Sequence, residues 1–160
     1  MASDVATSAV AVTPEQFLAH WQGHRRLTRR MIEAFPEDQL FTYSIGGMRP
    51  FGALALEMLA MTAPMVKGLV QDEWGEYDPP KATSRADLLR QWDEATEALE
   101  TWWPQLPASL FQEVRTVFGQ YTSQVYDLLL YGIDNEIHHR GQGYVYLRAL
   151  GIEPPAFYER

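Results

Sequence analysis

The sequence predicts an all-α protein built as a four-helix bundle. Four long stretches carry apolar residues at helical spacing, residues that start or stop helices bound each stretch, and strand signals are nearly absent. Four amphipathic helices joined by connections of moderate length bury their apolar faces against one another in a bundle. We expect residues 13–160 to form one domain. Residues 1–12, which are small and uncharged apart from Asp4, are expected to form a flexible tail.

The first two helices have clear boundary signals. Thr13 is a good N-cap residue, Pro14 suits the first helical position, and Gln16 stands where a capping box needs it. The second helix is expected over residues 50–70, where apolar residues dominate. Pro64 lies inside that run and should kink it, because proline cannot donate the backbone hydrogen bond of a helix interior.

The third and fourth helices follow from the same rules. Ser84 precedes the third helix as its N-cap, and Pro104 stops it. Residues 105–120 show no sustained period and are expected to be irregular, with room for one short helix. The fourth helix is expected over residues 122–150.

Composition and charge narrow the function. The chain has 160 residues, a net charge of −8 and no cysteine. An acidic chain is a poor match for nucleic acid, which needs a basic surface. Without thiolates, a metal ion must be held by imidazole, carboxylate, amide or water. The N-terminus lacks the basic segment of a signal peptide, and no apolar run looks long and clean enough to cross a bilayer. We therefore expect a cytoplasmic protein with neither nucleic-acid nor membrane partners.

The most informative stretch is the polar interruption of the last helix, residues 135–142, with the sequence NEIHHRGQ. At about 100° per residue, Glu136 and His139 lie near the centre of the buried face and Asn135 at its edge, whereas His138 points outward. The spacings i,i+3 and i,i+4 bring these side chains together on one face. The alternative is a core histidine that is simply hydrogen-bonded to a carboxylate.

A single carboxylate on the second helix strengthens the case for a site. Glu57 is the only charged side chain between Arg49 and Lys67. A carboxylate in so apolar a segment needs compensation. It can face His139 across the bundle, or it can reach solvent or pair with Arg140.

These residues define a candidate metal centre. We expect its ligands to be Glu57, Asn135, Glu136 and His139. Four further residues are expected around the substrate or behind the ligands, with Arg140 or Gln142 orienting an anionic group of the substrate. This outer set consists of His24, His138, Arg140 and Gln142.

Residues 135–142, together with YVYLR at 144–148 and GMRPFG at 47–52, resemble the DinB/YfiT-like family of metalloenzymes. The resemblance implies a four-helix bundle that often forms a homodimer. It also implies three histidines that bind zinc or nickel, one on the second helix and two on the last. Here His139 matches one of them and Asn135 stands in place of another. Glu57 or its neighbour Met58 stands in place of the third.

Two functions follow as hypotheses. The first is a metal-dependent hydrolase or thiol-dependent transferase that holds zinc, nickel or manganese between the second and last helices and acts on a small molecule. The second is a non-catalytic, stress-associated dimeric bundle, in which the same residues form a buried polar network or a small-ligand pocket. In both, a second apolar face of the last helix is available to a partner subunit. That face consists of Tyr126, Ile133, Ile137 and Tyr144.

Overall fold

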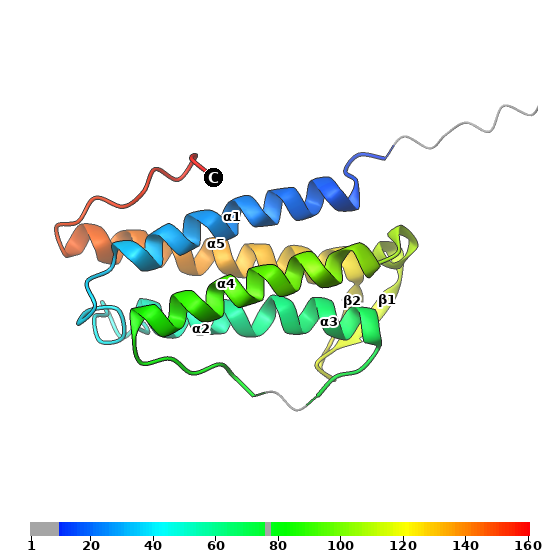
Figure 1. Ribbon diagram of the computed structural model, residues 1–160, viewed down its shortest axis with the longest axis horizontal. Helices are drawn as coiled ribbons and strands as arrows, with labels where there is room; N and C mark the ends of the chain where they lie inside the picture. Colours follow the sequence, from blue (N-terminus) through cyan, green and yellow to red (C-terminus); the bar gives the residue numbers. More distant parts are fainter. Residues whose placement is uncertain (1–9, 76–77) are drawn as a thin grey trace, which may run out of the picture.

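The computed structural model describes residues 10–75 and 78–160, and its long helices run side by side along the molecule (Figure 1). The expected tail therefore falls mostly outside the described residues. The predicted helical bundle is confirmed. Its elements are α1 (Pro14–Ala34), α2 (Phe51–Met61), α3 (Ala63–Gln71), α4 (Arg85–Trp102) and α5 (Val125–Ala149).

The N-capping signals at Thr13 and Ser84 act as predicted. Thr13 and Gln16 form a complete capping box at the start of α1, with Thr13 Oγ1 accepting from the Gln16 amide at 3.2 Å. Ser84 accepts from the amide of Asp87 at the start of α4. Gly151 follows α5 with a φ of +76°, which a glycine adopts without strain.

The expected second helix is divided rather than kinked. α2 and α3 lie end to end and are separated at Thr62, two residues before Pro64, with φ −92° and ψ −89°. The Thr62 hydroxyl donates to the Met58 carbonyl at 2.6 Å and accepts from Arg25 Nη1 at 3.3 Å. The interruption is therefore satisfied by side chains from inside the bundle.

The segment before α5 departs from expectation. It contains two short 3-10 helices (Trp103–Gln105 and Ala108–Gln112) and an antiparallel hairpin of β1 (Val114–Val117) and β2 (Tyr121–Gln124). The prediction of irregular structure was wrong for the hairpin, and α5 begins three residues later than expected. The strands are too short and too exposed to show an apolar alternation. Their turn depends on positive φ values at Phe118 and Gly119.

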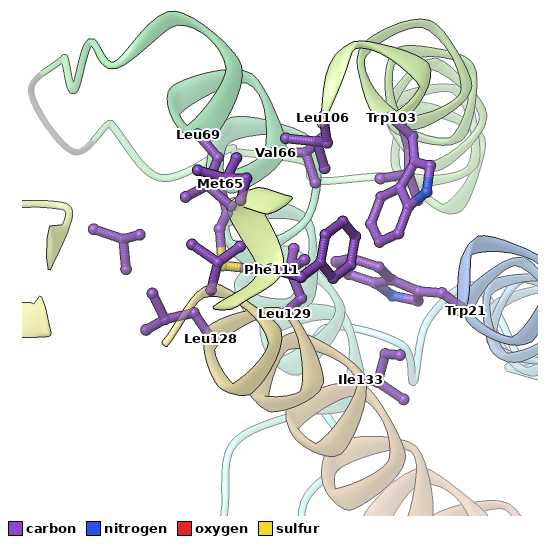
Figure 2. Packing of buried hydrophobic residues seen from close by; sticks show 14 residues of the cluster. Trp21, Met65, Val66, Leu69, Trp103, Leu106, Phe111, Leu128, Leu129 and Ile133 are labelled. Carbon is purple, nitrogen blue, oxygen red and sulfur yellow. The ribbon is translucent and has the colours of Figure 1, made fainter. Parts of the chain in front are cut away.

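The core consists of two apolar clusters separated by a polar layer. Near the hairpin, Trp21 packs edge-on against Trp103 with 6.1 Å between ring centroids, beside Phe111 and Leu129 (Figure 2). The other cluster surrounds Phe51 at the opposite end. Buried polar residues lie between the two clusters on every long helix or at its break. They are His24, Arg25, Thr28, Thr62, Asn135, Glu136, His139 and Arg140, with the half-buried Thr96 of α4 beside them.

Helices α2 and α3 test the expectation that no apolar segment is long enough to cross a membrane. Residues 51–71 reach a mean hydropathy of 1.5, so their length and composition alone would allow a membrane span, contrary to the sequence-based expectation. In the bundle, 56% of that window is buried against the other helices. A core helix meets the same criterion, so this finding is weak support for a span.

A glycine sets the close contact between α2 and α5. A Cβ atom on Gly143 would lie 2.5 Å from the Phe51 ring, whereas a Cβ on Gly141, one half-turn earlier, would meet nothing within 4 Å. We predict that Gly143→Ala lowers the free energy of unfolding by about 1–3 kcal/mol through overpacking. Gly141→Ala should raise it by up to about 1 kcal/mol through helix propensity. Chemical denaturation of both variants checks this, and equal effects would contradict the packing assignment.

Candidate functional site

The Glu57 side chain of α2 contacts two side chains of α5. Its Oε1 lies 3.0 Å from His139 Nε2 and accepts from Asn135 Nδ2 at 3.1 Å. Its Oε2 forms a salt bridge with Arg49, which lies two residues before the start of α2. The expected convergence of Glu57, Asn135 and His139 is therefore present in the structure. Glu57 pairs with Arg49 rather than with Arg140.

The donors around Glu57 fix its charge. Burial by itself raises the pKa of the Glu57 carboxyl, but hydrogen bonds from His139, Arg49 and Asn135 outweigh it and lower the pKa to about 2. An ionised carboxylate only accepts, so His139 Nε2 donates. Two buried atoms beside it, His139 Nδ1 and Asn135 Oδ1, have no hydrogen-bond partner within the described part of the chain.

Glu136 belongs to a different cluster. It faces α1, where its Oε1 accepts from the Thr28 hydroxyl at 2.6 Å and its Oε2 accepts from Trp21 Nε1 at 3.3 Å. Arg140 Nη1 lies 3.8 Å from Oε1. The structure thus separates Glu136 from the other three expected ligands. Burial raises the pKa of its carboxyl despite the nearby Arg25 and Arg140 guanidinium groups.

His24 and Arg140 complete this second cluster. Arg140 Nη2 lies 2.9 Å from His24 Nδ1, and Arg140 Nη1 donates to the Thr28 hydroxyl at 3.1 Å. His24 Nε2 in turn lies near His20 and Arg160. His24 was expected to line the metal cavity, but its contacts are made within the α1–α5 interface. Arg140 is likewise buried there, so its guanidinium is engaged rather than available to a substrate.

His138 and Gln142 lie on the exposed side of α5. Their side-chain nitrogens are 3.1 Å apart, away from Glu57. His138 is exposed, as helical geometry predicts for the neighbour of an inward-facing His139. Neither residue is hydrogen-bonded to Glu57, although the His138 ring lies beside that of His139, with 5.2 Å between the ring centroids.

Comparison with known proteins shows to which family the chain belongs. The model of the DinB family matches residues 5–160. The chain belongs to the DinB family. A DinB-like protein from Bacillus cereus has the same fold, with a TM-score of 0.70 and 20% identity over 93% of this chain and all of that one. The DinB-like protein YjoA from Bacillus subtilis gives a TM-score of 0.70 and 20% identity over 91% and 99%. No curated protein matches.

The metal site implied by the DinB resemblance can be tested against these side chains. Among residues 10–75 and 78–160, no three His, Cys, Asp or Glu side chains gather as a metal-binding group. The separations of His139 Nε2 and Asn135 Nδ2 from Glu57 Oε1, 3.0 and 3.1 Å, are ordinary hydrogen-bond lengths. As they lie, these side chains present N–H donors rather than ligand atoms. Binding an ion would require His139 Nε2 to lose its proton and the Asn135 amide to turn its oxygen toward Glu57.

Sequence reasoning missed Arg25. Its guanidinium is buried and donates to Thr96 Oγ1 at 2.9 Å, to the Trp92 carbonyl at 2.9 Å and to the Thr62 hydroxyl, while lying over the Trp92 ring. Burial lowers the pKa of Arg25 to about 10. In the sequence, Arg25 is one of four arginines in a short stretch that is typical of a solvent-exposed helix face. Only its position around the helix could have indicated that its side chain is buried.

His24 generates a prediction about pH. Burial, followed by the charges of Arg140, Arg160 and His20, lowers the pKa of His24 to about 3 from its usual 6.5. As the pH falls, the unfolded state therefore binds a proton at His24 before the folded state does. The contribution of neutral His24 to the free energy of unfolding is complete above pH 6.5 and is lost progressively toward pH 3. Between pH 6.5 and 5, the wild type should lose up to about 1.4 kcal/mol per pH unit relative to His24→Gln. Parallel profiles in denaturant titrations would contradict this.

Proposed function

We propose that the chain is a metal-dependent enzyme whose centre is formed by Glu57, Asn135 and His139. The observation that supports it is the convergence of an imidazole and an amide on one carboxylate oxygen, at 3.0 and 3.1 Å. These side chains come from two helices held in register by the core on either side. Zinc, nickel or manganese is the expected ion. Because oxygen donors dominate the set, we expect weaker binding than three imidazoles would give.

The reaction class proposed is hydrolysis or thiol-dependent transfer on a small molecule. A divalent ion with an open coordination position would lower the pKa of a bound water or thiol. Glu57 contributes the negative charge that such an ion requires, since its pKa of about 2 keeps it ionised. His139 is held by burial on α5, and the partly exposed Glu57 side chain leaves the centre open toward solvent.

One observation favours the second candidate function. Both oxygens of Glu57 already accept from N–H donors, so the carboxylate is satisfied without an ion, and only His139 Nδ1 and Asn135 Oδ1 are unpaired within the described part of the chain. In that case the same residues fix the register of α2 against α5, and the bundle serves as a non-catalytic scaffold or holds a small ligand.

His139→Ala separates the two candidates, and His138→Ala is its matched control because that imidazole is exposed and is hydrogen-bonded to Gln142 rather than to Glu57. For a metal centre, calorimetric titration with zinc, nickel and manganese should show binding by the wild type and by His138→Ala. Binding should be lost in His139→Ala. If no ion binds the wild type below about millimolar while His139→Ala costs about 1–3 kcal/mol of stability, the network is the correct function.

A homodimer through α5 is the second part of this proposal. Tyr126, Leu130 and Ile137 are each more than a third exposed along one side of α5, and a groove of about 1110 Å³ between α1 and α5 includes Tyr126 and Leu130. Ile133, expected on this outer face, is instead buried. Tyr144, also expected there, donates to the Pro155 carbonyl of the C-terminal segment. The exposed apolar strip is therefore narrower than the sequence predicts.

Leu130→Glu tests the dimer. Placing a carboxylate in the apolar strip should convert a dimer to a monomer in light scattering after gel filtration, because an unpaired charge would have to be buried. Tyr131→Glu, at the next and also exposed position, should leave the dimer intact. A wild type that is monomeric at high concentration would contradict the assembly.

A further inference from the structure

A large groove lies beside the first turns of α1, and no residue of the Glu57 cluster lines it. It has a volume of about 1110 Å³ and lies between α1, the second 3-10 helix and the first half of α5. Its floor includes Phe111 and Ile133, which belong to the buried apolar cluster of Figure 2, and its rim includes the exposed Tyr126 and Leu130. Small-molecule sites are typically hollows of roughly 300–1,000 Å³ with mostly apolar walls. The groove therefore has the size and the lining of such a site.

The lining of the groove favours an uncharged ligand. Charged residues make up 21% of the chain, yet none of the described residues that line the groove is Asp, Glu, Lys or Arg. A charged group that entered would leave water without meeting a counter-ion, which is strongly unfavourable. The aromatic rings of Phe17, Phe111 and Tyr126 offer surfaces against which a planar or alkyl body can pack. Apolar contact would therefore supply most of the affinity.

His20 adds one hydrogen-bond donor to this lining. Arg140 Nη2 lies 2.9 Å from His24 Nδ1, and because a guanidinium only donates, Nδ1 accepts and neutral His24 carries its proton on Nε2. That N–H donates to His20 Nε2 at 3.2 Å. Arg160 Nη1, which is 3.1 Å from the same nitrogen of His24, cannot be hydrogen-bonded there, since a neutral imidazole has a single acceptor and Arg140 occupies it. His20 then carries its own proton on Nδ1, which has no hydrogen-bond partner within the described part of the chain.

We propose that this groove binds an uncharged small molecule with an aromatic or alkyl body and one oxygen acceptor, such as a ketone or an amide, which accepts from His20 Nδ1. The site is separate from the proposed metal centre and does not depend on it. Binding there would use a preformed apolar hollow and a donor whose tautomer is set by its buried neighbours.

A second copy of the chain is the alternative occupant, because the strip of the proposed dimer shares Tyr126 and Leu130 with the groove. These two residues lie at the rim, whereas Phe111 and Ile133 lie below it and are buried. A helix packed across the rim would close the groove and leave its floor to the ligand. The two occupants are therefore distinguished by whether ligand binding and self-association compete.

The first experiment measures by calorimetry the affinity for acetylnaphthalene, an uncharged aromatic ketone, at about pH 8, where an ordinary imidazole is neutral. Ala108→Phe places a ring in the groove, and the control Ser109→Phe places it at the next position, which is exposed but does not line the groove. Wild type and Ser109→Phe should bind, and Ala108→Phe should bind at least about tenfold more weakly, because the ring displaces apolar contacts of the ligand. No binding by the folded wild type, or equal affinities in all three proteins, would overturn the site. An affinity that falls as the protein concentration rises would assign the groove to a second copy and overturn it too.

The second experiment tests the hydrogen bond and the charge with two molecules of similar shape, ethylnaphthalene, which lacks the acceptor, and naphthoate, which is a carboxylate. His20→Phe keeps a ring at this position and removes the donor. The ratio of ketone to hydrocarbon affinity should be about 2- to 12-fold lower in His20→Phe than in the wild type, which corresponds to one net hydrogen bond. Naphthoate should bind the wild type at least about tenfold more weakly than the ketone does. An unchanged ratio would overturn the role of His20, and naphthoate binding as tight as that of the ketone would overturn the uncharged ligand class.

Discussion

The Glu57 carboxylate is the constraint around which α2, α5 and the loop before α2 are arranged. It is the only charge in a long apolar segment, and placing it between helices without partners would cost several kcal/mol. His139, Asn135 and Arg49 together meet that requirement. The register of α2 against α5 follows, because a shift of either helix by one residue would separate the carboxylate from its donors.

The same requirement shapes the layer across the middle of the bundle. Glu136 needs Thr28, Trp21 and Arg140, and the buried Arg25 needs oxygen acceptors from α4 and from the break at Thr62. The interruption between α2 and α3 thus supplies a partner for a buried cation. Two apolar clusters enclose this layer, so polar contacts specify which helix meets which, while apolar burial supplies most of the stability.

Much of the fold and part of the site could be predicted from residues close together in the sequence. The capping box at Thr13 and the N-cap at Ser84 depend on neighbouring residues only, and the isolation of Glu57 is visible in the sequence. Helical phase also placed His139 inward and His138 outward. Phase could not separate Glu136 from His139, because both point into the bundle but toward different neighbours, α1 and α2. Arg25 was missed because its partners come from elements distant in the sequence. The hairpin was missed because its four-residue strands are too short and too exposed to show an apolar alternation.

The proposed function depends on a divalent metal ion bound at Glu57. The most direct test is a crystal structure of the protein soaked in zinc, with anomalous difference maps collected at the zinc edge. A metal centre predicts a peak within bonding distance of Glu57 Oε1 and His139 Nε2. A map without a peak there, in which Arg49 still contacts the carboxylate, would contradict it.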